Sequence, residues 1–198
     1  MHVFRFACLG LAALLLAACL PVTSDNPVGS TTGFKPDPAL VGLWKGHGED
    51  KNNKDEKDAY FAFLRGEDGD MTAVLITPEK ESDDWGSYEV QVATLGANHI
   101  MNVRGATKNG KPVTDEMDRE IIPMRYDIGK DGKLTLSLLD DKATTAAIKA
   151  GRIKGTVHEG SENDCHITAS PKELDTFFST KEGAALFSAK LVVLTKVK

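Results

Sequence analysis

Short stretches in which apolar and polar residues strictly alternate constrain the fold of this chain more than any other feature. In the segment 88–94, YEVQVAT, the side chains of Tyr88, Val90 and Val92 fall on one face. In 134–138, LTLSL, every second residue is a leucine. Because successive side chains of a strand point to opposite faces, a period of two is typical of antiparallel strands with one buried face. The fold class is therefore predicted to be mainly β.

Two longer segments have the pattern of β-hairpins. The segment 60–77, YFAFLRGEDGDMTAVLIT, has Asp-Gly at its centre, and 125–139, RYDIGKDGKLTLSLL, has a glycine-rich tip at 129–132. Such turn residues between apolar runs favour tight reversals of the chain. Further strands are predicted around 98–105 and at 190–197. Tandem hairpins at this spacing predict an antiparallel meander that closes into a barrel or folds into a sandwich, within a single domain spanning 39–198.

Two or three short helices are expected late in the chain. The segment 140–151, DDKATTAAIKAG, contains good helix formers and ends on Gly151, which suits a C-terminal cap. In 170–178, SPKELDTFF, Ser170 and Glu173 have the spacing of a capping box, and proline occupies the first helical position. Leu174, Phe177 and Phe178 then share one face at helical spacing, so they are expected to pack into a core.

The N-terminus has the organisation of a secretory signal. Arg5 is its only Lys or Arg, and the uncharged run 7–18 is shorter than the roughly 20 apolar residues that cross a bilayer. Leu16-Ala17-Ala18-Cys19 resembles the lipobox of bacterial lipoproteins. The resemblance implies cleavage of the signal peptide 1–18, a diacylglycerol on the Cys19 sulfur and a further acyl chain, such as palmitate, on the new amine. An ordinary signal peptide that ends near a cysteine by chance is the alternative.

The residues after the cysteine bear on the location of the protein. Leu20 stands where many inner-membrane lipoproteins carry Asp, so the resemblance implies an outer-membrane lipoprotein facing the periplasm, with the inner membrane as the alternative. The segment 19–38 is rich in Pro, Thr, Ser and Gly and lacks apolar periodicity. It is predicted to be a lipidated cysteine followed by a flexible tether with a root-mean-square reach of roughly 25 Å.

The cysteine count excludes a disulfide framework. Cys8 leaves with the signal peptide and Cys19 is used by lipid, so Cys165 has no partner within the mature chain. The sequence favours Cys165 as a small buried residue on the same strand face as Ile167. A reactive thiol or an intermolecular bridge is the alternative.

Composition excludes several classes of function. The chain has 24 Lys and Arg against 29 Asp and Glu, and loss of Arg5 with the signal leaves a net charge near −6. A mildly acidic chain without a basic run is unsuited to nucleic acid or to an anionic lipid surface. The sequence has no nucleophile elbow, no His-Glu-x-x-His, no phosphate-binding glycine loop and no Cys-x-x-Cys. It is therefore predicted to be a non-enzymatic protein without a cofactor.

Gly42-Leu43-Trp44, at the start of the first predicted strand, resembles the Gly-x-Trp signature of lipocalins and lipocalin-like (calycin-type) barrels. The resemblance implies an antiparallel barrel in which Trp44 covers one end. It further implies that a basic residue of the last strand, here Lys196, packs over the tryptophan. The family's second motif, which contains a tyrosine, is absent. Trp44 as an ordinary core aromatic is the alternative.

The candidate binding residues follow from alternation. Taking the more apolar face of each strand as inward predicts a barrel lining that includes Val90, Val92, Leu134, Leu136 and Val193. A hollow barrel with such a lining would favour fatty acyl or other apolar molecules over sugars or ions.

One histidine pair is a candidate metal site. The segment 155–168, GTVHEGSENDCHIT, is predicted to form a hairpin, and a tip centred on Glu162 would place His158 opposite His166. Facing imidazoles can chelate a transition metal, although a structural site usually needs four ligands and a catalytic site three. A solvent-facing cross-strand pair is the simpler interpretation.

These observations favour a lipid-anchored, periplasm-facing envelope lipoprotein that acts as a non-enzymatic binding module for a small apolar ligand. The alternative is a protein-interaction or assembly accessory of the envelope with a fully packed domain. An enzyme that uses an unrecognised carboxylate or histidine site is a third hypothesis. A hollow interior would separate the first from the second, because small barrels are either filled by side chains or hold one ligand.

Overall fold

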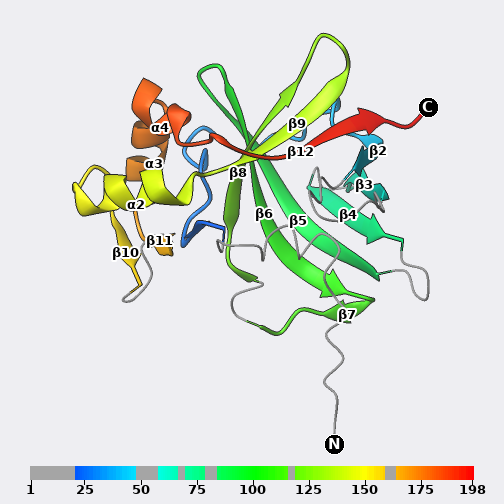
Figure 1. Ribbon diagram of the computed structural model, residues 1–198, viewed down its shortest axis with the longest axis horizontal. Coiled ribbons are helices and arrows are strands. Elements are labelled where there is room, and N and C mark those ends of the chain that lie inside the picture. Colours follow the sequence, from blue (N-terminus) through cyan, green and yellow to red (C-terminus); the bar gives the residue numbers. More distant parts are fainter. Residues whose placement is uncertain (1–20, 48–57, 67–69, 79–83, 116–118, 159–163) are drawn as a thin grey trace, which may run out of the picture.

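The computed structural model describes residues 21–47, 58–66, 70–78, 84–115, 119–158 and 164–198, and the account below concerns these residues. Eight strands form a closed antiparallel barrel (Figure 1). In chain order they are β2 (Gly42–His47), β3 (Asp58–Arg65), β4 (Met71–Thr77), β5 (Asp84–Leu95), β6 (Asn98–Lys108), β8 (Ile122–Ile128), β9 (Lys133–Leu138) and β12 (Ala189–Lys196). Each pairs with the next, and β12 pairs with β2 to close the ring. The predicted mainly β fold and the closure of its meander into a barrel are confirmed.

The barrel has two different ends, which we name for use below. The capped end is where β2, β4, β6 and β9 begin, and the far end is where these four strands finish. The short strand β7 (Lys111–Pro112) pairs with the last residues of β6 and therefore lies at the far end. Both predicted hairpins are present, as β3 with β4 and as β8 with β9.

A second lobe is inserted between β9 and β12. It contains α2 (Asp141–Lys149), β10 (Gly155–Val157), β11 (Cys165–Ile167), α3 (Pro171–Phe178) and α4 (Lys181–Ala185). The lobe sits beside the barrel in Figure 1, and its core includes Leu95 of β5 and Ile100 of β6. Because neither residue belongs to the interior cluster of the barrel, the lobe covers part of the barrel's outer wall. None of the described helices is long and apolar enough to cross a membrane.

The predicted helix ends are present. After α2, Gly151 has a φ of 68°, and the amides of Gly151 and Arg152 donate to the carbonyls of Ile148 and Ala147. This is the hydrogen-bond pattern of a Schellman cap. Before α3, the Glu173 carboxylate accepts from the Ser170 amide at 2.9 Å and from its hydroxyl at 2.7 Å. The contact with the Lys154 ammonium, followed by these two bonds from Ser170, lowers the pKa of Glu173 to about 2.

The residues before the barrel differ from the flexible tether predicted for 19–38. Residues 21–41, which we call the strap, are packed against the protein. Strand β1 (Thr23–Ser24) pairs in parallel with β11, and Val22 and Val28 are buried. The composition of this segment suits a linker, but its contacts come from distant side chains. Residues 19 and 20 lie outside the described residues.

Candidate functional site: the barrel interior

The interior of the barrel is an apolar cluster with contributions from all eight strands. Its largest members that are less than 2 % exposed are Trp44, Phe63, Met101, Tyr126, Leu134 and Leu194, together with Leu40 of the strap. Residues this inaccessible have almost no surface in contact with water. Side chains therefore fill the part of the barrel that these residues occupy.

Trp44 is the centre of the capped end. Its ring is 1 % exposed, and its Nε1–H donates to the Leu40 carbonyl at 2.7 Å. The Lys196 ammonium lies 5.1 Å from the ring centroid, the contact that the lipocalin resemblance implies. Gly42 has a φ of 132°, and a Cβ there would meet Lys196 Cε at 2.9 Å. The glycine of the Gly-x-Trp motif therefore makes room for the lysine that covers the tryptophan.

A second polar contact ties the strap to the capped end. The hydroxyl of buried Tyr126 donates to the Asp37 carboxylate at 2.9 Å. Burial, followed by the hydrogen bond to Asp37, raises the pKa of Tyr126 well above its usual value. The phenol therefore stays protonated and remains a donor at physiological pH. No local pattern predicts this pair, because the composition of 19–38 indicates a tether.

Four of the five predicted lining residues point into the barrel. Val90, Val92, Leu134 and Leu136 belong to the interior cluster and are at most 4 % exposed. Val193 does not point inward. On β12 the inward residues are Val192 and Leu194, which lie opposite Leu136 and Leu134, whereas Val193 lies opposite Thr135.

Part of the inner wall in the far half of the barrel is only partly buried. Leu75 of β4, Tyr88 of β5 and Met124 of β8 pack against the interior cluster but remain partly exposed. Leu75 lies opposite Gly86, and Tyr88 Oη lies 3.2 Å from the position of a Cβ on Gly86, near the start of β5. Val41 and Ile128, at the capped end, are also partly exposed, so the interior keeps accessible apolar surface toward both ends.

The structure does not place the two candidate metal ligands opposite each other. Val157 lies opposite Cys165 and Thr156 opposite His166, so the hairpin register differs from the one predicted. The His158 amide donates to the Asp164 carbonyl, and its imidazole is largely exposed. Across the described ranges, no group of three or more His, Cys, Asp or Glu side chains is arranged to hold a metal ion.

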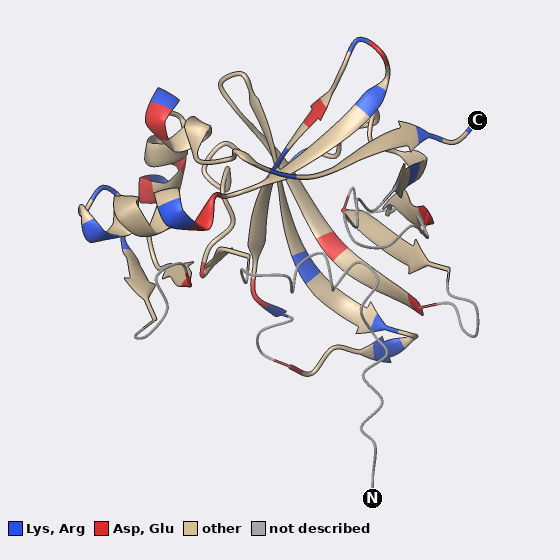
Figure 2. Ribbon diagram, viewed as in Figure 1, with Lys and Arg blue, Asp and Glu red and all other residues tan. Residues whose placement is uncertain are grey.

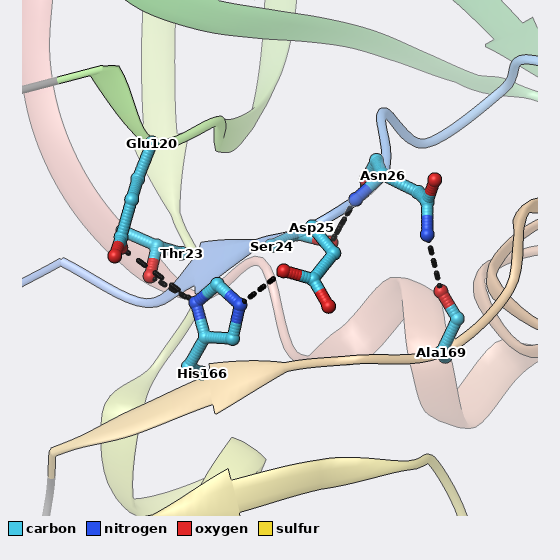
Figure 3. A network of polar contacts seen from close by, with 7 residues as sticks. All are labelled: Thr23, Ser24, Asp25, Asn26, Glu120, His166 and Ala169. Carbon is cyan, nitrogen blue, oxygen red and sulfur yellow. Dashed lines mark hydrogen bonds and ion pairs between the residues drawn. The ribbon is translucent and has the colours of Figure 1, made fainter. Parts of the chain in front are cut away.

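His166 instead joins the strap to the lobe (Figure 3). Its Nδ1 lies 2.7 Å from the Thr23 hydroxyl and 3.6 Å from a Glu120 carboxylate oxygen, and its Nε2 lies 2.9 Å from Asp25 Oδ1. The two carboxylates approach opposite sides of the ring, so they cannot share one metal ion with it. Asn26 adds a bond from its amide to the Ala169 carbonyl at 3.1 Å. This network fixes the beginning of the strap.

Cys165 is a free, buried thiol in the core of the lobe, as the sequence favoured. It is 3 % exposed and shares its strand face with Ile167, which is fully buried. Burial raises the pKa of the thiol, which keeps it in the unreactive protonated form.

Two buried polar side chains hold the middle of the strap, and sequence reasoning missed both. Asn102 of β6 accepts from the Val28 amide and donates to the Val28 carbonyl, each at 2.8 Å. Asp175 of α3 accepts from the amides of Gly29 at 2.6 Å and Thr31 at 2.8 Å, and from the Thr31 hydroxyl. Polar residues at 3 % and 6 % exposure need such partners.

Comparisons with known proteins give no relative: no family model matches the chain, and neither a curated protein nor a solved structure is similar to it. Any functional assignment therefore rests on the barrel, the strap and the N-terminal motif.

Proposed function

We propose that this chain is an envelope lipoprotein, anchored through acyl chains on Cys19 and facing the periplasm, whose barrel holds a small apolar ligand. The observation that carries the proposal is the group of partly exposed apolar residues on the inner wall of the far half of the barrel. Leu75, Tyr88 and Met124 of the far half pack against the interior cluster and remain partly exposed, while Trp44 fills the middle of the capped end. A site with one closed end and apolar walls suits an acyl or similar group.

The burial pattern also limits the size of the ligand. Val90, Val92, Leu134 and Leu136 are almost inaccessible, so a ligand cannot run the length of the barrel without moving side chains. The ligand is therefore short, or only one end of it enters. The same burial supports a second candidate, an interaction or assembly protein of the envelope with a packed barrel. The outer membrane is the proposed location, on the grounds of Leu20.

The anchor is tested at Cys19. Changing Cys19→Ala is expected to abolish metabolic labelling with palmitate and to leave the precursor uncleaved, because the lipobox cysteine is both the acylated residue and the cleavage site. Changing Cys165→Ala is the control, and it should leave labelling intact because this thiol is buried in the lobe. Labelling that persists in the Cys19 variant would contradict the proposed anchor.

Ligand binding is tested with a fluorescent fatty acid and the chain 21–198, which contains every contact described above. We expect a Kd in the micromolar range, about −8 kcal/mol. Met124→Glu places a charge on the inner wall of the far half and should weaken binding by about tenfold or more, roughly 1.4 kcal/mol. Thr72→Glu, on the exposed outer face of β4, is the matched control and should leave Kd unchanged.

A wild-type chain that fails to bind the fatty acid, while remaining folded, would remove the binding module and favour the packed interaction protein. Equal binding by Met124→Glu and wild type would place the fluorophore outside the barrel. Circular dichroism of the variant separates lost binding from lost folding.

A further inference from the structure

The strap runs along the outside of the barrel from the far end to the capped end. At its start, the Ser24 amide donates to the Ile121 carbonyl at 2.9 Å, just before β8 begins at the far end. Val28 is held at Asn102, within β6. The Lys35 amide then donates to the Val92 carbonyl at 2.9 Å, near the capped end of β5. The first described residues therefore lie at the far end.

The acyl chains of the proposed anchor cannot leave that end. Val22 is 3 % exposed and Thr23 is paired with His166, so the chain is fixed from its first few described residues. Only Cys19 and Leu20 precede Pro21, and two extended residues span roughly 7 Å. A barrel lipidated at Cys19 is thus held with its far end close to the bilayer.

The rim of the far end carries side chains that suit a membrane interface. Trp85, at the start of β5, is 39 % exposed. Its amide donates to the side-chain oxygen of Asn109, and its carbonyl accepts from the Asn109 amide in the adjacent hairpin. Lys108 and Lys111 face each other across β6 and β7 and are exposed (Figure 2). Tryptophan and lysine are enriched where protein meets headgroups, because each has an apolar body and a polar tip.

Three described carboxylates of this end make contacts within the protein. The Asp84 carboxylate accepts from the Asn109 amide at 2.7 Å. Asp25 and Glu120 approach the two nitrogens of His166. The two exposed rim lysines are a local exception to the acidic composition of the chain, which carries a net charge of −5, and they are the groups that would meet anionic lipid.

We propose that the far end of the barrel is a bilayer-contacting surface, with Trp85 in the headgroup region and Lys108 and Lys111 toward anionic phospholipid. This inference rests on the proposed anchor at Cys19. It also specifies how that anchor serves ligand binding, since the partly exposed inner residues Leu75, Tyr88 and Met124 belong to the half of the barrel nearest the membrane. An apolar ligand would then pass between bilayer and barrel by a short path.

The test uses the mature lipidated protein in vesicles of phosphatidylcholine and phosphatidylglycerol with brominated acyl chains, which quench nearby tryptophan. The chain has two tryptophans, and Trp44 lies at the opposite end of the barrel. We expect bromine to quench part of the wild-type emission and the remaining Trp44 emission of Trp85→Phe to be unaffected. Absence of quenching in the wild type, or equal fractional quenching in Trp85→Phe, would overturn the orientation.

Charge reversal tests the rim lysines. Lys108→Glu with Lys111→Glu should reduce the quenching of Trp85 in anionic vesicles but not in vesicles of phosphatidylcholine alone. Lys130→Glu with Lys133→Glu makes the same charge change at the capped end and should have no effect. Equal behaviour of the two double variants would overturn the role of the rim lysines.

Mass spectrometry of Cys19 in the same preparation separates the two proposals. Absent acyl chains overturn the anchor and the orientation together. Acyl chains present without quenching overturn the orientation alone, and leave the ligand-binding proposal to its own fluorescence test.

Discussion

Replacing Trp44 by alanine is expected to lower the free energy of unfolding by about 3–5 kcal/mol, the usual cost of removing a large aromatic from a core. The ring is 1 % exposed and packs in the interior cluster, and its Nε1–H satisfies the Leu40 carbonyl. Alanine would leave a cavity at the capped end and an unpaired carbonyl. Urea titration followed by circular dichroism measures the change.

The second tryptophan provides the matched control. Trp85→Ala removes the same side chain from an exposed rim position, so it should cost less than about 1 kcal/mol. Lys196→Met keeps most of the lysine's apolar stem but removes the cation over Trp44, which should cost about 1 kcal/mol. If Trp44→Ala is no more harmful than Trp85→Ala, the capped end is not a packed plug.

Alternation predicted the inner face of a strand wherever its outer face is polar. In β9 the leucines are separated from one another by Thr135 and Ser137, and in β5 Gln91 separates Val90 from Val92. In β12 the run 191–194 is Leu-Val-Val-Leu, which is apolar on both faces and gives no contrast. The pairing of β12 with β9 also shifts between Lys190 and Val192. The prediction that Val193 points into the barrel was therefore wrong, because β12 has no polar outer face to mark the inner one.

The register of the β10–β11 hairpin failed for a related reason. The stretch 159–163 contains several residues that favour turns, so the sequence does not fix the turn centre. Pairing Val157 with Cys165 places the apolar pair on the lobe core and leaves His166 facing the strap. An error of one residue in a turn centre was enough to make a histidine pair that the structure does not contain.

The strap shows where composition misleads. Its Pro, Thr, Ser and Gly residues resemble a linker, and it has no apolar period. It is ordered by contacts from residues far along the chain, Asn102 and Asp175, which sit on β6 and α3. Polar side chains that bind backbone groups across the fold leave no local signal, because their partners become neighbours only after folding.

Replacing Asp175 by alanine is expected to cost about 3–4 kcal/mol of unfolding free energy, because it leaves the buried Gly29 amide and the part-buried Thr31 donors without a charged acceptor. The carboxylate accepts three hydrogen bonds, from Gly29 N–H, Thr31 N–H and the Thr31 hydroxyl, at 6 % exposure. Asp127→Ala, which removes an exposed carboxylate paired with Arg125, is the control and should change stability by less than about 0.5 kcal/mol.

A double-mutant cycle with Asn102 asks whether the strap releases as one unit. Asn102→Ala alone should cost about 2 kcal/mol, since the amide and carbonyl of Val28 both lose their partner. Asn102 and Asp175 bind neighbouring residues of the strap. If loss of one side chain detaches the strap, the hydrogen bonds to the other side chain are lost as well. The double variant should then cost clearly less than the sum of the two single variants. Hydrogen exchange should show amides 28–31 losing protection in either single variant. If the losses of unfolding free energy are additive and protection is lost only locally, Asn102 and Asp175 each hold their own residues independently.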